Sequence, residues 1–332
     1  MDDRIRALSA WLATTLAGAG FRLETASADA SFRRYFRVFL AEGTRVAMDA
    51  PPDREDSRPF LHVARLMHEA GLHAPAILAH DLAQGFLLLE DLGTRSYLAA
   101  LREMPEVDRL FGDATSALVR WQAASRAGEL PEYDEALLRR ELMLFPDWYL
   151  ARHRGVTLSP AQREALEGVF RAILAVNLAE PRIYVHRDFM PRNLMVCDPN
   201  PGILDFQDAV HGPISYDVAC LFRDAFISWD EERVLDGTIR YWEKARAAGL
   251  PVRAEFAEFW RDVEWMGLQR HLKVLGIFAR LHHRDGKAGY VEDAPRFMGY
   301  VRHTVDRYRE LAPLGRLLDE MEGRESRARY TL

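Results

Sequence analysis

Two acidic residues and one amide stand at a spacing that could serve a chemical reaction. Asp188 and Asn193 lie five residues apart, directly after His186-Arg187. Asp205 follows after two short apolar runs, 194–197 and 203–204, separated by a turn-forming stretch that predicts a β-hairpin. A carboxylate can accept the proton of a hydroxyl group, and carboxylate and amide oxygens are the ligands that Mg²⁺ prefers. This order of residues is typical of sites that transfer phosphoryl groups.

The hairpin determines how these residues could act together. It should bring residues 193 and 205 side by side at its open end. We therefore predict that Asp188 is the catalytic base and that Asn193 and Asp205 bind Mg²⁺ against the phosphates of ATP. The alternative is a surface loop with scattered polar residues, which the His-Arg-Asp triplet alone would allow. Triplet, spacing, hairpin and second aspartate together favour phosphoryl transfer.

Composition limits the classes of protein to consider. The chain has 332 residues, of which 48% are hydrophobic, and a net charge of −6, so a broad nucleic-acid-binding surface is not expected. The acidic N-terminus does not resemble a signal peptide, and no apolar run reaches the ~18 residues of a membrane span. Two cysteines make a disulfide framework improbable. We expect a cytoplasmic monomer that binds neither nucleic acid nor membrane.

Residues 1–92 are predicted to form a small, β-rich N-terminal lobe that binds the phosphates of ATP. Hydrophobic periodicity and turn residues predict helices over 3–17 and 57–70, and strands over 21–25, 32–40, 44–48, 75–80 and 86–90. Glu90-Asp91-Leu92-Gly93 ends this pattern and is the expected hinge. By position alone, Glu90 and Leu92 are assigned to the adenine end of the ATP site.

Residues 93–332 are predicted to form a large, mainly helical C-terminal lobe. Helices are expected over 95–102, 106–127, 134–153, 160–179, 216–226, 230–248, 252–284 and 294–311. The tail after about residue 318 is expected to be a polar helix end that frays. The predicted fold is therefore α+β, with the bilobal architecture of the protein kinases.

The turn before Phe32 is the expected phosphate-binding segment. A glycine-rich G-x-G-x-x-G pattern placed there would fall on Ala28, Ala30 and Arg33, so it contains no glycine. We predict that Ser31, Phe32, Arg33 and Arg34 contact ATP, because guanidinium groups match phosphate geometry. Neighbouring side chains of a strand point to opposite faces, so only one of the two arginines should face ATP. The alternative is a solvated arginine pair.

A lysine that could bind the phosphates is absent from this lobe. Only three of the 44 basic residues are lysines, and none precedes Lys244. Aligning Val46-Ala47-Met48-Asp49 with the V-A-I-K strand of kinases puts Asp49 at the lysine position. Either an arginine takes over this role or the protein does not catalyse the reaction.

Several segments together resemble the aminoglycoside phosphotransferase superfamily. They are Asp-Ala-Ser-Phe-Arg-Arg-Tyr (29–35), Met-Asp-Ala-Pro-Pro (48–52), Leu-Leu-Glu-Asp-Leu-Gly (88–93), His-Arg-Asp-Phe-Met-Pro-Arg-Asn-Leu (186–194) and Leu-Asp-Phe-Gln-Asp-Ala (204–209). Within the superfamily they look closest to bacterial kinases that phosphorylate the cell-wall amino sugars N-acetylmuramate and N-acetylglucosamine at the anomeric hydroxyl. The resemblance covers roughly residues 5–312. It implies a cytosolic enzyme of peptidoglycan recycling that depends on ATP and Mg²⁺.

The resemblance also implies a sugar pocket beside the catalytic loop. Glu141 and Trp148 are candidates for its wall, although residues 142, 145 and 149 would form a core stripe on the same helix. Cations between Arg261 and Arg284, Arg270 among them, would suit a lactyl carboxylate better than a polycationic aminoglycoside. Arg187 and Asp208 complete the predicted substrate residues. His186 and Asp217 are assigned structural roles, Asp217 as a buried carboxylate that braces the catalytic loop.

Two other functions stay open at this point. A kinase of another small hydroxyl compound, such as an aminoglycoside, choline or homoserine, would carry the same catalytic residues. A nucleotide-binding scaffold without turnover is favoured by the missing lysine and disfavoured by the complete set Asp188, Asn193 and Asp205.

Overall fold

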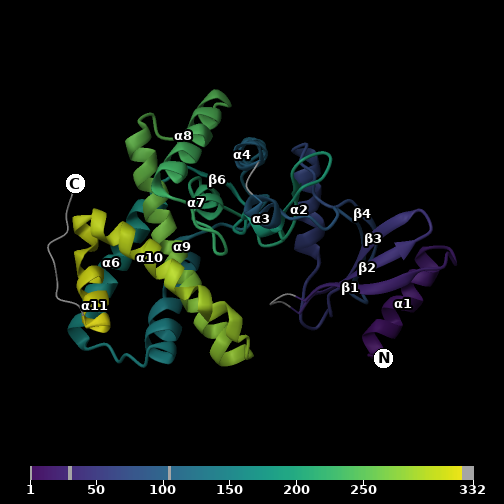
Figure 1. The fold of residues 1–332 in the computed structure, drawn as a ribbon, viewed down its shortest axis with the longest axis horizontal. Helices are drawn as coiled ribbons and strands as arrows, with labels where there is room; N and C mark the ends of the chain where they lie inside the picture. Colours follow the sequence, from purple (N-terminus) through teal and green to yellow (C-terminus); the bar gives the residue numbers. More distant parts are fainter. Residues whose placement is uncertain (1, 29–31, 104–105, 324–332) are drawn as a thin grey trace. The chain divides into compact units, whose positions relative to one another are not determined.

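The computed structural model describes residues 2–28, 32–103 and 106–323 (Figure 1). Contacts along the chain divide it into two compact units. The first comprises residues 1–120 and 192–208, and the second comprises residues 121–191 and 209–332. The predicted lobe boundary after residue 92 divides the chain differently, since residues 93–120 and the hairpin after Arg192 pack with the first unit. As a division into functional lobes, that boundary stays a prediction.

The first unit contains an antiparallel five-stranded sheet in the order β1-β2-β3-β5-β4. Its strands are β1 (Arg22–Ala28), β2 (Arg34–Leu40), β3 (Gly43–Asp49), β4 (Ile77–Asp81) and β5 (Phe86–Glu90). All five were expected near these positions. β2 and β3 pair without a bulge, from Arg34 opposite Asp49 to Leu40 opposite Gly43. Side chains of these two strands therefore alternate regularly between the two faces of the sheet.

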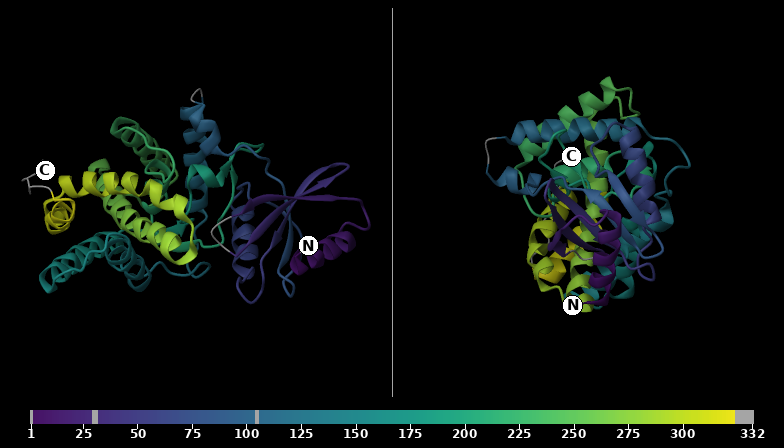
Figure 2. Two further views of the ribbon diagram at one scale, coloured as in Figure 1. Left: turned by 60° about the horizontal axis from the view of Figure 1, so that its bottom comes forward. Right: turned by 90° about the vertical axis from the view of Figure 1, so that its right-hand side faces the viewer.

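Two helices lie on opposite faces of this sheet, α1 (Asp3–Thr15) and α2 (Arg58–Glu69) (Figure 1). Leu8 and Leu12 of α1 pack against Phe36 and Val38 of β2, in a core that also contains Ala47. Because residues 36, 38 and 47 share the α1 face, residues 35, 37 and 46 belong to the other face. Figure 2 shows α1, in purple, beside the strands.

The predicted hairpin forms in the first unit and is tied to the chain around it. β7 (Leu194–Met195) pairs with β8 (Gly202–Ile203), and a 3₁₀ segment, Pro191–Asn193, precedes it. The N–H of Ile203 donates to the carbonyl oxygen of His73 at 2.8 Å. A Cβ at Gly202 would come within 2.7 Å of Cys197 Sγ and 2.8 Å of the Leu92 side chain, so a larger residue here would require these side chains to shift. Helices α3 (Tyr97–Arg102) and α4 (Val107–Ala123) follow the hinge.

The second unit is mainly helical, and its core surrounds the long helix α9. Its elements are α5 (Glu135–Leu142), a π-helical segment (Phe145–His153), α6 (Pro160–Leu178), β6 (Arg182–Val185), β9 (Val210–Pro213), α7 (Tyr216–Phe222), α8 (Glu231–Ala247), α9 (Phe256–Asp285), 3₁₀ segments (Ala288–Asp293 and Arg309–Leu311), α10 (Ala294–Arg307) and α11 (Ala312–Glu322). Figure 2 shows α9 and α10 side by side, in green and yellow. Among the described residues, no helix is both long enough and apolar enough to cross a bilayer.

Two predictions for this unit were wrong in detail, and one pair of strands was not predicted. The helix expected over 134–153 is divided near Pro146, which cannot donate a backbone hydrogen bond. The antiparallel pair β6 and β9 was not expected, because a short buried apolar run is ambiguous between helix and strand. A fraying tail was expected after about residue 318, but α11 continues to Glu322 with Leu314, Leu317 and Leu318 buried in the core, and the rest of that tail, residues 324–332, lies outside the described residues.

Candidate active site

The predicted catalytic loop, 186–188, lies in the second unit and is held by a buried carboxylate. β6 leads into His186, and Asp217 at the start of α7 accepts hydrogen bonds from the backbone N–H groups of His186 at 2.6 Å and Arg187 at 3.0 Å. Burial raises the pKa of Asp217 to about 7, although the two N–H groups oppose this rise. The N–H of Asp188 donates to His186 Nδ1 at 3.3 Å. These bonds fix the backbone that presents Asp188.

Arg187 adopts a left-handed backbone conformation, with φ at 75°. Such a conformation is costly for a residue with a side chain and persists where the surroundings enforce it, often at functional sites. The Nη2 atom of Arg187 lies 2.5 Å from Glu141 Oε1, and its guanidinium lies 5.6 Å from the centre of the Tyr133 ring. Asp217 and Glu141 thus hold the main chain and the side chain of Arg187.

Glu141 is buried among donors from its own unit. Oε1 contacts Arg187 and Lys273 Nζ, the latter at 2.9 Å, while Oε2 accepts hydrogen bonds from Tyr133 and from Gln269 Nε2 at 3.3 Å. Burial alone would raise the pKa of Glu141, but the charges of Lys273 and Arg187 lower it to about 2. These contacts fit a bracing role. We propose that role for Glu141, in place of the substrate contact that the sequence suggested.

The other predicted substrate residues have different environments. Trp148 is partly buried and packs against the core of the second unit. Arg270 is 2% exposed and donates from Nη1 to the carbonyl oxygen of Arg223 at 3.4 Å. Burial opposes its charge, yet Cys220, Tyr216 and the carboxylate of Asp188 raise its pKa.

The cationic run of α9 is largely neutralised within the second unit. Arg261 pairs with Glu310, Lys273 with Glu141 and Arg284 with Asp285. Three of the five arginines and lysines in this run are thus paired with carboxylates, and the buried Arg270 stays the candidate for an anionic substrate group. Asp208, in the first unit, is exposed and lies 3.5 Å from the Gln207 amide.

The predicted metal ligands meet at the end of the hairpin in the first unit. Asn193 Nδ2 donates to Asp205 Oδ2 at 3.3 Å, and the N–H of Leu204 donates to the Asn193 carbonyl oxygen at 2.9 Å. Asp205 also has a positive φ, 62°, and accepts a hydrogen bond from Gln207 at 2.9 Å. One carboxylate and one amide, fixed side by side, are a donor set that fits Mg²⁺.

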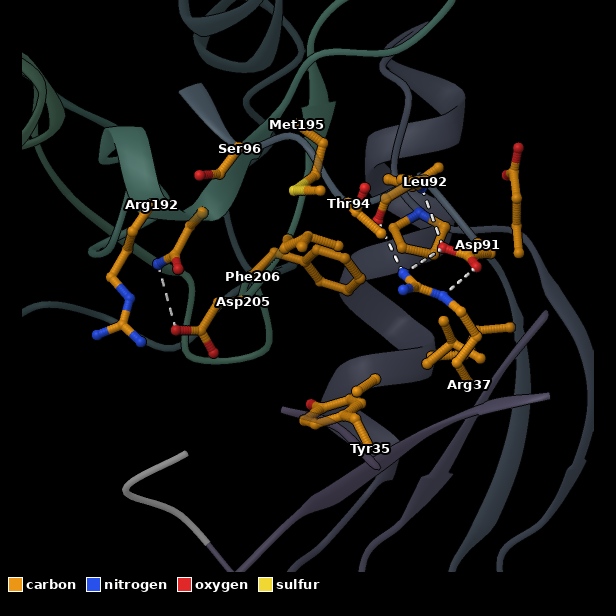
Figure 3. A pocket seen from close by; sticks show the side chains of 18 of the residues that line it. Tyr35, Arg37, Asp91, Leu92, Thr94, Ser96, Arg192, Met195, Asp205 and Phe206 are labelled. Atoms are coloured by element: carbon orange, nitrogen blue, oxygen red, sulfur yellow. Dashed lines mark hydrogen bonds and ion pairs between the residues drawn. The ribbon is translucent and has the colours of Figure 1, made fainter. Parts of the chain in front are cut away.

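The same unit contains a cavity of about 340 Å³, lined by the expected hinge (residues 90–93), by Thr94 and by the hairpin. Phe206 lies in its wall with its ring centre 4.7 Å from that of Phe60 on α2, and Met195 and Leu92 add further apolar surface (Figure 3). Asn193 and Asp205 line the same cavity. An apolar pocket of this size with a few polar groups at one end suits a nucleotide base and its phosphates.

The two hinge residues that the sequence assigned to ATP both line this cavity. The carboxylate of Glu90 accepts a hydrogen bond from the Ala76 N–H at 3.1 Å and lies 3.2 Å from His73 Nε2. The side chain of Leu92 is buried. In these positions Glu90 and Leu92 could contact a base bound at the hinge.

The predicted phosphate-binding residues 32–34 do not line this cavity. Ser31 is outside the described residues. Phe32 is 58% exposed, and its N–H donates to Glu55 at 3.2 Å. Arg33 forms an ion pair with Glu55 at 3.0 Å, and Arg34 pairs with Asp49. None of the described residues of this turn lines the cavity.

The alignment of Asp49 with the kinase lysine was wrong, because the side chain of Asp49 lies on the face of the sheet opposite to the cavity. Val46 lines the cavity, whereas Ala47 packs in the α1 core, so the regular alternation of β3 turns Asp49 toward α1. Asp49 is fully buried there and pairs with Arg4 and Arg34. It is therefore not an acidic replacement for a phosphate-binding lysine.

Sequence reasoning missed several other polar residues that line the cavity. Arg37 donates from Nε and Nη2 to the carboxylate of Asp91 at 2.7 and 3.0 Å. Tyr35 lies two residues earlier on β2, and Arg192 directly precedes Asn193. The alternation along β2 could have identified Tyr35 and Arg37. Phe36 and Val38 are apolar and are expected to face the core, so Tyr35 and Arg37 are expected on the opposite face.

Comparison with known proteins identifies the family. Residues 22–258 match the model of the phosphotransferase enzyme family. The chain belongs to this family. An N-acetylmuramate/N-acetylglucosamine kinase of Pseudomonas aeruginosa is 52% identical, and one of Neisseria meningitidis is 51% identical, each over 96% of both chains. The structure of a choline/ethanolamine kinase family protein from Mesorhizobium loti has 18% identity and a TM-score of 0.64, covering 94% of this chain and 99% of that one.

Family membership confirms two predictions made from the motifs. The chain is a phosphotransferase, as the order of Asp188, Asn193 and Asp205 indicated. The predicted α+β fold of the kinase type is also confirmed, with an antiparallel sheet in one unit and mainly helices in the other.

Proposed function

We propose that this phosphotransferase uses ATP and Mg²⁺ to phosphorylate N-acetylmuramate and N-acetylglucosamine at the anomeric hydroxyl. The observation that carries the substrate is the identity of about half of all residues with two kinases of that name, over 96% of both chains.

Each part of the reaction has candidate residues. The hinge and the apolar cavity would take the adenosine, and Asn193 and Asp205 would hold Mg²⁺ at the phosphate end. When bound, Mg²⁺ supplies charge neutralisation for the phosphates. Asp188 would accept the proton of the acceptor hydroxyl, from a loop that Asp217 holds in place.

The acceptor would bind to the helical second unit. Arg270 is a buried cation there that could receive the carboxylate of N-acetylmuramate, and Trp148 offers an aromatic surface. N-acetylglucosamine lacks that carboxylate, so an Arg270→Met variant should lose activity with N-acetylmuramate and keep activity with N-acetylglucosamine. We place the reaction in the cytoplasm, in the recycling of peptidoglycan, and expect a monomer.

A panel of acceptors tests the proposal. Purified protein is incubated with ATP and Mg²⁺ and with N-acetylmuramate, N-acetylglucosamine, kanamycin, choline or homoserine, and ADP release is followed. We expect turnover with the two amino sugars and a ³¹P resonance of a sugar 1-phosphate. The Asp188→Asn variant is the control for contaminating kinases.

Other outcomes would redirect the assignment. Turnover with kanamycin, choline or homoserine but with neither amino sugar would keep the phosphotransferase and overturn the acceptor. A phosphate ester at another hydroxyl would overturn the anomeric position. ATP binding without turnover on any acceptor would favour the scaffold.

A further inference from the structure

The first unit must balance the negative charge of bound phosphates without a lysine. None of its residues is a lysine, because Lys244 is the first in the chain. Mg²⁺ neutralises only part of the charge of a nucleoside triphosphate, and a preorganised cation usually supplies the remainder. Among the described residues, the cations that line the nucleotide-sized cavity are Arg37 and Arg192.

Arg37 is already engaged at the hinge. Its guanidinium donates to both carboxylate oxygens of Asp91, and Nη2 also donates to the carbonyl oxygen of Gly93 at 3.0 Å. The Asp91 side chain is 4% exposed, so moving Arg37 to a phosphate would leave a buried carboxylate without its cation. Arg37 therefore serves the hinge.

Arg192 lies at the other end of the cavity. Figure 3 shows Arg192 and Asp205 at one end, and Asp91 and Arg37 at the opposite end. Arg192 directly precedes Asn193, whose side chain bonds to Asp205 and whose carbonyl oxygen accepts the N–H of Leu204. The cation and the two metal ligands are thus placed by one short, bonded piece of backbone.

From this placement we propose that Arg192 binds the phosphates of the nucleotide and replaces the lysine of other kinases. The proposal rests on the proposed function in one respect, that a nucleoside triphosphate is the phosphoryl donor. A guanidinium binds two phosphate oxygens at once, and at this position it would act beside Mg²⁺. Arg192 would then select for the charged end of the nucleotide and contribute nothing to the base.

Binding calorimetry without any sugar tests this role. Adenosine, ADP and ATP are titrated with Mg²⁺ into the wild-type protein and into Arg192→Gln and Arg192→Lys. We expect Arg192→Gln to weaken the binding of ADP and of ATP by roughly 10–100-fold, the usual effect of losing a hydrogen bond to a charged group. Adenosine affinity should not change. Arg192→Lys should recover part of the loss, because it restores a point charge without the fork.

The matched control is Arg58→Gln, which removes an exposed arginine of the same unit that pairs with Asp56 at 2.8 Å. It should leave all three affinities unchanged. The proposal would be overturned if Arg192→Gln weakened the binding of adenosine and of ATP equally, or if it weakened the binding of neither. If wild-type protein binds no nucleotide, the proposed function itself fails, whereas a wrong sugar acceptor leaves this measurement unaffected.

Discussion

Arg34 forms an ion pair with Asp49, with Nη2 and Oδ2 2.5 Å apart, on the face of the sheet that packs against α1. The two residues are directly opposite each other on β2 and β3. Arg4 of α1 joins the same carboxylate. The pair therefore links the N-terminal helix to the sheet, and it directs Arg34 away from the nucleotide-sized cavity.

Replacing Arg34 by Ala should lower stability and leave ATP binding unchanged. Asp49 is fully buried and would keep only Arg4, so we expect a loss of about 1–3 kcal/mol in the free energy of unfolding. Urea unfolding and the Michaelis constant for ATP measure the two effects. Arg58→Ala, which breaks an exposed pair, should cost less than about 1 kcal/mol. A raised Michaelis constant for ATP with normal stability would contradict this assignment.

Sequence patterns predicted the elements well where periodicity and turn chemistry agreed. The five strands of the first unit, both of its packing helices and the 194–203 hairpin appear near their expected positions. The predictions failed where tertiary contacts decide. Strand β8 begins at Gly202, one residue before the expected strand, and Gly202 forms a β-bridge with His73, a contact that leaves no periodic signal in the sequence.

The site was predictable to the extent that its chemistry is local in the chain. Asn193 and Asp205 were placed together because the hairpin between them is a local structure. The partners of Glu141 were not predictable, because Lys273 comes from a helix more than 130 positions further along the chain. Asp49 of β3 was assigned to the wrong face of the sheet, because the alignment with the kinase motif was shifted by one residue. A shift of one residue along a strand moves every side chain to the opposite face.

Replacing Asp188 by Asn tests the catalytic base. The amide keeps the shape but cannot accept a proton, so turnover should fall by roughly 10²–10⁴-fold. ATP affinity measured by calorimetry should stay near the wild-type value. Near-normal turnover would remove Asp188 from the mechanism.

Replacing Asp205 by Ala tests the metal site. It removes the carboxylate that accepts the hydrogen bond of Asn193 and leaves Mg²⁺ with one protein ligand fewer. We expect activity to collapse and a Mg²⁺ titration to restore it only in part. Since Asp205 also bonds to Gln207, a melting curve should accompany the titration. An unchanged Mg²⁺ dependence would exclude Asp205 as a ligand.

Replacing Asp217 by Ala tests the support of the catalytic loop. The backbone N–H groups of His186 and Arg187 would lose their buried acceptor, at a cost of about 1–3 kcal/mol each. We expect lower stability together with lower turnover, because the loop presents Asp188. Asp217→Asn keeps one acceptor oxygen and should lie between wild type and Ala on both measures. Wild-type turnover in a destabilised Ala variant would show that the brace does not position Asp188.

Replacing Lys273 by Met tests the buried charge network around Glu141. The pH dependence of the unfolding free energy separates the effect of the charge from an effect of packing. In the folded protein the charges of Lys273 and Arg187 outweigh burial and lower the pKa of Glu141 from 4.5 to about 2. A lowered pKa stabilises the fold above the ordinary pKa, and this contribution is lost as pH falls from 4.5 through 2. Its size is about 3 kcal/mol.

Without the ammonium group of Lys273, the pKa of Glu141 should rise. The difference in unfolding free energy between wild type and Lys273→Met should then be largest above pH 4.5 and shrink toward pH 2. Urea unfolding at several pH values measures it, and Lys244→Met, at a lysine of α8 outside this network, is the control. A difference that is the same at every pH would mean that Lys273 acts through packing against Tyr216, whose hydroxyl lies 3.1 Å from Nζ, and not through its charge.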